Sequence, residues 1–214
     1  MLNIKTFVCN PLSENTYVVS DETKECAIID CGAYYDGERD ALTNYINDNH
    51  LKPVHLLCTH GHFDHNYGID TIYNMYGLKA EIGAGDDFLI SDIAGQFKKI
   101  VGVQLNRQYP AAGYFFGKDE VIRFGSHQLQ VLPTPGHTPG GVTFYCKEEA
   151  VAFSGDTLFR MSVGRTDFEG GDFGQLQQSL KEVLGKLPAE TKVYCGHGPT
   201  TTIGDELAYN PYLR

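Results

Sequence analysis

The sequence predicts an α/β (α+β) fold in which two β-sheets pack against each other and helices cover their outer faces. Strand-like segments come first, then helices, then strands again, and finally a helix and a strand, so the pattern is spread over two halves. The 214 residues are 42% hydrophobic, which is enough for one large core. We therefore expect one domain over residues 1–214.

The first half begins with short strands separated by polar turns, a pattern typical of an antiparallel meander. A helix with one apolar face follows, and then an apolar run typical of a buried strand. Two more helices flank a short strand, and a loop rich in glycine and tyrosine ends this half. The expected strands are 2–8, 15–19, 26–30, 53–58 and 79–82, the expected helices are 36–49, 66–76 and 86–104, and the expected loop is 106–117.

The second half returns to strands after Glu120. Two strands joined by Gly125-Ser126 form a predicted hairpin, and two further strands follow it. A helix with leucines on one face then precedes the last expected strand. The expected strands are 121–124, 127–132, 142–146, 150–154 and 192–195, and the expected helix is 173–187.

Composition and charge exclude several classes of function. The net charge of −10 argues against a nucleic-acid surface, because no basic stripe is present to replace counterions. No apolar run reaches about 18 residues, so we expect no membrane span. The N-terminus does not resemble a signal peptide, and the six cysteines form no C-x-x-C pair. We expect Cys26, Cys58 and Cys146 to be reduced core residues, and we expect a cytoplasmic location. The sequence carries no signal for an oligomeric state.

The densest group of polar side chains lies between Thr59 and His65. Three imidazoles and a carboxylate fall within six positions there, which no hydrophobic core requires. Imidazole is the commonest metal ligand in proteins, and a carboxylate completes a site suited to zinc, manganese or iron. His60 and His62 point the same way on an extended segment, whereas Asp64 and His65 fall where a helix should begin. One segment could therefore supply ligands to two adjacent ions.

Three further turns place a polar side chain among glycines where an expected strand ends. Each has a plain alternative, because a lone histidine beside Gly-Pro is usually a turn residue and an aspartate after glycine is usually a turn or a helix cap. Four such sites in one chain favour ligands instead. The three turns contain His137, Asp156 and His197. Asp30 also ends a strand, and it is either a turn carboxylate or a partner behind a ligand histidine.

The motifs T-H-x-H-x-D-H, P-G-H-T-P-G, S-G-D-T-L-F and G-H-G-P together resemble the metallo-β-lactamase-fold hydrolases. The resemblance is greatest to the hydroxyacylglutathione hydrolase (glyoxalase II) branch, and it extends from residue 15 to residue 213. Segments 164–172 and 198–204 resemble a short, single-domain subgroup of that branch. The resemblance implies a four-layer αββα sandwich of two mixed β-sheets, with the site at one edge of the sheets.

The resemblance also implies a set of metal ligands. Matched to the family pattern, the first metal would be held by His60, His62 and His137, the second by Asp64, His65 and His197, and both by Asp156. Family members carry two zinc ions or mixtures with iron or manganese. Two divalent metal ions, zinc first, are therefore the expected cofactors.

The chemistry implied is hydrolysis by a metal-bridging hydroxide, because the ions would lower the pKa of bound water to about 7 and polarise the substrate carbonyl. Asp64 would orient the hydroxide or carry its proton. Arg165 is either a surface arginine or a clamp on a substrate carboxylate, and we favour the clamp. Two divalent ions outweigh two carboxylates and a hydroxide, which suits a small anionic substrate. Tyr34 and Tyr114 are weaker candidates to line the cleft.

These features predict a hydrolase of thioesters such as S-lactoylglutathione. Full-length glyoxalase II enzymes carry an additional C-terminal helical region with basic residues for glutathione, and we expect no such domain here, which leaves a different thiol carrier open. One alternative is a persulfide dioxygenase with a mononuclear iron held by two histidines and an aspartate. Others are a hydrolase of a lactone, β-lactam or phosphodiester bond, and a binding module that has lost catalysis.

Overall fold

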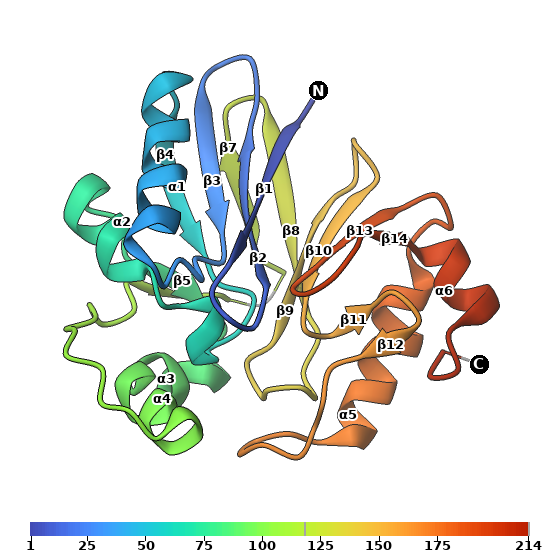
Figure 1. The fold of residues 1–214 in the computed structure, drawn as a ribbon. Helices are drawn as coiled ribbons and strands as arrows, with labels where there is room; N and C mark the ends of the chain where they lie inside the picture. Colours follow the sequence, from blue (N-terminus) through green and yellow to red (C-terminus); the bar gives the residue numbers. More distant parts are fainter. Residues whose placement is uncertain (118, 214) are drawn as a thin grey trace.

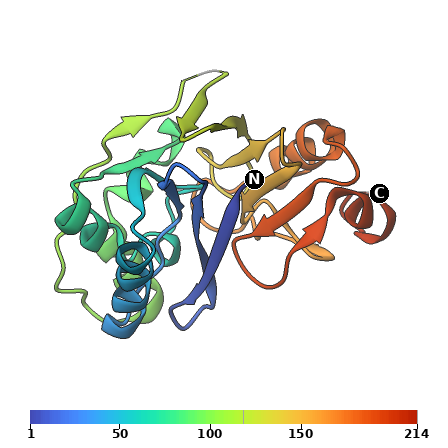
Figure 2. The same ribbon diagram turned by 90° about the horizontal axis from the view of Figure 1, so that it is seen from above.

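The structure is a computed structural model that describes residues 1–117 and 119–213, so Lys118 and the end of the expected domain at Arg214 lie outside it. Two six-stranded sheets face each other, with helices on the outer side of each (Figures 1 and 2). This arrangement confirms the predicted sandwich of two mixed sheets between helices. Within the described residues, no helix has the length and apolar character of a membrane span.

The first sheet follows the chain order from β1 to β6. Its strands are β1 (Asn3–Cys9), β2 (Glu14–Ser20), β3 (Glu25–Ile29), β4 (Lys52–Leu57), β5 (Ala80–Ile82) and β6 (Tyr114–Phe115). The first three strands are antiparallel, which confirms the predicted meander, and the last four are parallel neighbours. Parallel pairing requires crossover connections, and these bring the ends of β3 and β4 to the same edge of the sheet.

The second sheet has the order β14-β13-β10-β9-β8-β7. Its strands are β7 (Val121–Phe124), β8 (His127–Pro133), β9 (Val142–Cys146), β10 (Val151–Gly155), β13 (Lys192–Cys195) and β14 (Thr201–Thr202). Only β10 and β13 are parallel among these pairs. A small hairpin of β11 (Leu158–Phe159) and β12 (Ser162–Val163) follows β10. Because β8, β10 and β13 run in one direction, their carboxyl ends share an edge.

The helices lie outside the two sheets (Figure 1). They are α1 (Asp36–Asp48), α2 (Ile69–Tyr76), α3 (Asp87–Ile90), α4 (Ile93–Val101), α5 (Phe173–Gln178) and α6 (Ile203–Tyr209). A π turn and a 3₁₀ turn continue α5 to Lys186, close to the expected end. Gly77 ends α2 with a φ of 72°, as expected of a glycine after the last helical turn.

Alternation along the strands divides the core into layers. Val18 and Ile28 pack toward the first group of helices, whereas Val19 and Ile29 face the second sheet. All four side chains are fully buried, and each such burial stabilises the fold by about 1.5–3 kcal/mol relative to exposure. A third cluster lies between the second sheet and the C-terminal helices; it includes Leu176, Leu180, Leu184, Val193 and Ile203.

Several expected elements differ from the structure. The single helix expected over 86–104 is wrong, because the chain breaks it into α3 and α4, and Asp92 caps α4 by accepting a hydrogen bond from the Gly95 N–H. The loop expected over 106–117 contains β6, which pairs with β5. Residues 192–195 are not the last strand, since β14 and α6 follow. The six cysteines are buried and unpaired, which includes the three predicted to be reduced core residues.

Candidate metal centre

The predicted ligands lie on loops at one edge of the two sheets. The segment 59–65 follows β4, His137 follows β8, Asp156 follows β10 and His197 follows β13. Glycines allow these loops to approach closely: a Cβ on Gly196 would lie 2.2 Å from Asp156 Oδ1. The structure therefore brings together side chains that are up to 137 positions apart in the sequence, from His60 to His197.

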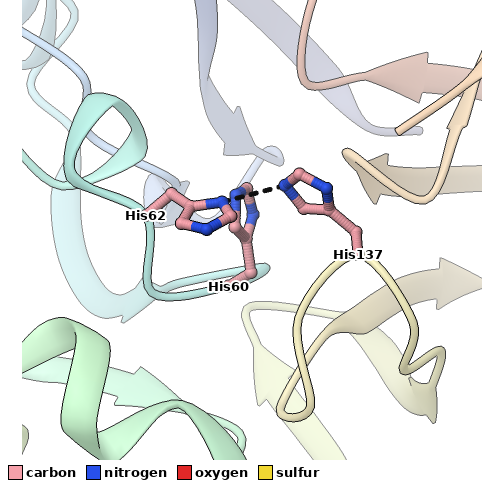
Figure 3. A group of neighbouring side chains, drawn as sticks. All are labelled: His60, His62 and His137. Atoms are coloured by element: carbon pink, nitrogen blue, oxygen red, sulfur yellow. Dashed lines mark hydrogen bonds between the residues drawn. The ribbon is translucent and has the colours of Figure 1, made fainter. Parts of the chain in front are cut away.

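His60, His62 and His137 form one group, and their ring nitrogens point toward one another (Figure 3). One nitrogen of each ring lies within 4.8 Å of the other two. His62 Nδ1 is 2.9 Å from His137 Nε2, and the ring centroid of His60 is 4.9 Å and 4.8 Å from theirs. His62 has an extended backbone, with φ −66° and ψ 147°, and all three side chains are buried.

Asp64, His65 and His197 form the second group. Asp64 and His65 lie in the 3₁₀ turn Phe63–His65, which turns them away from the first group. His65 Nε2 is 3.2 Å from His197 Nε2, and Asp64 Oδ2 is 3.4 Å from His197 Nε2. Asp156 lies between the groups, with its two oxygens 3.2 Å from His65 Nε2 and 3.5 Å from His137 Nε2.

In four of the five histidines of these two groups, the ring Nδ1 lies within hydrogen-bond distance of an oxygen. The acceptors are Thr59 Oγ1 for His60 at 3.1 Å, Asp30 Oδ2 for His65 at 2.9 Å, the Arg165 carbonyl for His137 at 2.6 Å and the Leu12 carbonyl for His197 at 3.0 Å. When Nδ1–H donates to these oxygens, Nε2 carries the lone pair. The bare Nε2 atoms therefore face the centre of the cluster, and Asp30 is the partner behind a histidine rather than a simple turn carboxylate.

This arrangement fits divalent cations. The Nε2 lone pairs of His65 and His197 would repel each other at 3.2 Å unless a positive charge lies between them. The buried Nε2 of His60 has no hydrogen-bond partner, although it faces the other ligand groups. Buried polar atoms normally have partners, and metal coordination supplies one. The donor set of imidazoles and carboxylates suits zinc, iron or manganese.

The electrostatics of the cluster agree with this fit. Burial lowers the pKa of His62 to about 3 and that of His60 well below its usual value, so both rings are neutral at pH 7. Burial alone would also lower the pKa of His65, but Asp156, Asp30 and Asp64 hold it well above its usual value. The carboxylates thus favour a positive charge at the second group, whether a proton or a metal ion supplies it.

Asp86 is a residue that the sequence analysis missed. Its buried carboxylate accepts hydrogen bonds from the N–H groups of Gly61 and Gly140 at 2.8 Å and 2.6 Å, and from the Thr138 hydroxyl at 2.7 Å. Gly61 and Thr138 belong to the two loops that carry the first histidine group. Asp86 therefore fixes these loops relative to each other. In the sequence Asp86 only begins the expected helix 86–104, and no local pattern marks its role because its partners are distant in sequence.

A cavity of about 430 Å³ opens over the cluster. Its lining residues are Leu12, His62, Phe63, Asp64, Ile100, His137, Asp156, Phe159, Arg165, Phe168 and His197. Arg165 lies at this cavity with its guanidinium 3.9 Å from the Phe168 ring, and it also pairs with Asp167 at 2.6 Å. The expectation that Tyr34 and Tyr114 line the cleft is wrong: Tyr34 packs on Phe97, and Tyr114 lies on β6 and donates to Glu120.

Comparison with known proteins identifies the family. The sequence pattern described as the Metallo-beta-lactamase superfamily matches residues 9–197. The chain belongs to this superfamily. Hydroxyacylglutathione hydrolase GloC of Haemophilus influenzae is 32% identical over 100% of this chain and 99% of that protein. This confirms the resemblance drawn from the motifs, and the protein is a metallo-hydrolase of the superfamily.

Two solved structures of the superfamily cover nearly the whole chain. The BLEG-1 B3 metallo-beta-lactamase has a TM-score of 0.90 at 34% identity, with 100% of this chain and 99% of that chain covered. TTHA1623, solved in a di-iron-bound form, has a TM-score of 0.86 at 35% identity, with 98% and 100% covered. The superfamily fold and the His/Asp cluster of this chain both agree with divalent metal ions at the cluster.

Proposed function

We propose that this superfamily member hydrolyses a thioester, with S-lactoylglutathione or a related hydroxyacyl thioester as the substrate. The observation that supports it most is the pair of histidine and carboxylate groups joined by Asp156, which suits two adjacent cations. Similarity to a hydroxyacylglutathione hydrolase over the full chain supports the choice of bond.

In this proposal His60, His62 and His137 would hold the first metal ion, Asp64, His65 and His197 would hold the second, and Asp156 would contact both. When bound, two divalent ions supply a hydroxide nucleophile at neutral pH and a Lewis acid for the carbonyl oxygen. Zinc is the proposed metal, with iron as the alternative because TTHA1623 was solved with two iron ions. The residues of this chain fix the histidine tautomers and orient the substrate carbonyl.

Asp64 is proposed to orient the nucleophile and to carry its proton. Its carboxylate lines the cavity, and its side chain is 11% exposed. Burial would raise the pKa of Asp64, but His65 and His197 hold it below its usual value, so the carboxylate is ionised at pH 7. An ionised oxygen facing the cavity can accept a hydrogen bond from the attacking group.

Arg165 is proposed to bind a carboxylate of the substrate. The guanidinium lies at the rim of the cavity, and its bidentate contact with Asp167 shows that the fork is presented in a geometry that carboxylates accept. Both partners are more than half exposed, so this pair contributes little to stability and can exchange for a substrate carboxylate. A small anionic thioester is therefore the proposed substrate class.

The direct test is turnover of S-lactoylglutathione by purified, zinc-loaded protein, followed as loss of thioester absorbance. We expect hydrolysis that stops when a chelator removes the metal and returns when zinc is added. Asp64→Asn should lower kcat by about 10²-fold or more, the scale of a lost acid–base group. Asp70→Asn, at a buried carboxylate paired with Arg107 and outside the cavity, is the matched control. Absence of metal-dependent turnover with a panel of thioesters would defeat the proposal.

Hydrolysis of a β-lactam is the second candidate function, because the chain is similar to the BLEG-1 B3 metallo-beta-lactamase along its whole length. The same pair of cations would serve an amide carbonyl as well as a thioester carbonyl. The two functions are distinguished by measuring kcat/KM for S-lactoylglutathione and for a chromogenic cephalosporin and taking the ratio of the first to the second. A ratio well above one favours the thioesterase, and a ratio below one favours the lactamase.

A further inference from the structure

A second, smaller cavity of about 110 Å³ opens beside the main one. It lies between α4 and the segment that leads from β12 toward α5, two parts of the chain at the same end of the molecule (Figure 1). Three residues line both cavities: His62, Ile100 and Phe168. The small cavity therefore adjoins the space over the metal-ligand cluster, and we call it the side groove.

The side groove presents apolar surface to a ligand. Its apolar lining consists of Leu89, Ile100 and Phe168. Ile100 also lines the main cavity, and it is 49% exposed. The Phe168 ring lies nearly perpendicular to the His62 ring, with centroids 5.7 Å apart, and the Arg165 guanidinium lies over the Phe168 ring. Contact with an apolar group would remove this apolar wall from water, which is favourable.

The polar side chains of the side groove already have partners. The Gln96 amide donates hydrogen bonds to the carbonyls of Gly61 and Leu89 at 3.2 Å and 2.7 Å. Lys99 pairs with Glu169 at 3.7 Å, and this exposed pair stands at the groove on opposite walls. A polar ligand would have to compete for these groups, whereas an apolar one leaves them intact.

We propose that the side groove is a second subsite, which takes an unbranched apolar arm of the thioester while its carbonyl lies at the metal-ligand cluster. This inference rests on the proposed function and specifies its substrate class. The arm is either the acyl chain or an alkyl part of the thiol, since both chains extend from the thioester group. The subsite therefore predicts thioester substrates in which one arm is longer and more apolar than a lactoyl group.

Two series of thioesters test the subsite and distinguish the two arms. In one series the acyl chain grows from acetyl to octanoyl on a constant thiol, and in the other an acetyl group is carried on n-alkyl thiols of increasing length. In the series whose arm occupies the groove, we expect kcat/KM to rise about four-fold per added methylene and then level off. If both series are hydrolysed and neither shows a rise with chain length, the proposal is overturned.

Ile100→Asn and Val101→Asn form a matched pair of variants. The two residues are neighbours on α4 and are equally exposed at 49%, but Val101 lines neither cavity. Ile100→Asn should flatten the dependence of kcat/KM on chain length, and Val101→Asn should leave the wild-type slope. Equal slopes in the two variants would overturn the proposal, because the length dependence would then arise elsewhere.

Binding of n-alkanoates separates this inference from the proposed function. Calorimetric titration of zinc-loaded protein with butanoate through decanoate should show affinity that increases with length in the wild type and not in Ile100→Asn. If no thioester is hydrolysed but this pattern appears, the subsite stands and the thioesterase function falls. If thioesters are hydrolysed but neither turnover nor alkanoate affinity depends on length, the subsite falls and the function stands.

Discussion

Histidines occupy two different kinds of environment in this protein. At the edge of the sheets that carries the proposed ligands, His65 and His197 each have Nδ1 hydrogen-bonded to an oxygen. Their Nε2 atoms face each other. Elsewhere, His55 has oxygens at both nitrogens, with Glu81 Oε1 at 2.7 Å and the Arg123 carbonyl at 3.0 Å. His127 likewise lies 2.9 Å from Asp21 and 3.2 Å from Glu149.

The comparison shows that residue type alone does not make a metal site. Each of these four histidines has an oxygen partner at one nitrogen, and the difference lies in what faces the other nitrogen. Two facing lone pairs favour a positive charge between them, whereas an oxygen can accept a hydrogen bond from the N–H of the ring. The carboxylates are not the distinguishing feature, since His127 has two of them as neighbours.

The largest expected effect comes from removing a proposed ligand. His60→Ala and Asp156→Ala should each lower activity by about 10³-fold or more, because several kcal/mol of transition-state stabilisation come from the metal ions. Metal content, measured by elemental analysis after dialysis, should fall with activity. His127→Ala should keep both, although it removes an imidazole beside carboxylates. Full metal occupancy in His60→Ala and Asp156→Ala would show that these residues are not metal ligands and that they do not differ from His127 in this respect.

A smaller effect is expected from changing Asp30, which contacts the proposed ligand His65 rather than a metal ion. Asp30 accepts hydrogen bonds from His65 Nδ1 and from the N–H and hydroxyl of Thr59, so Asp30→Asn should weaken the hold on the ring and its tautomer. We expect a 10- to 100-fold loss of metal affinity, measured by competition with a chromogenic chelator. Asp21→Asn changes the matching carboxylate beside His127 and should leave metal affinity unchanged. Equal losses in both variants would indicate general destabilisation.

The smallest effect concerns His55 and pH. The hydrogen bond to Glu81 raises the pKa of His55 in the folded protein above its usual value near 6.5. The stabilising contribution is therefore fully present below about pH 6.5 and is lost as pH rises through the folded-state pKa. Urea unfolding should show that His55→Gln costs more at pH 5.5 than at pH 8.5, by less than about 1 kcal/mol. A pH-independent cost would contradict the charged pair.

Local patterns predicted most elements because they depend on neighbours in the sequence. The alternation through Val18 and Val19 was visible as a strand, and Gly77 marked the end of a helix. The break before α4 was not predicted, because apolar residues keep helical spacing across it and only the cap at Asp92 interrupts them. Strand β6 was missed because two residues become a strand only when β5 lies beside them.

The sequence by itself determined the family, and it placed each proposed ligand after an expected strand and hence at one edge of the sheets. The tertiary structure alone decided how the histidines are oriented. The Leu12 and Arg165 carbonyls fix His197 and His137, and Asp86 ties two loops together. Every residue has a backbone carbonyl, so no sequence pattern marks the one that will meet a given imidazole. That pairing follows from distances that only the packed chain sets.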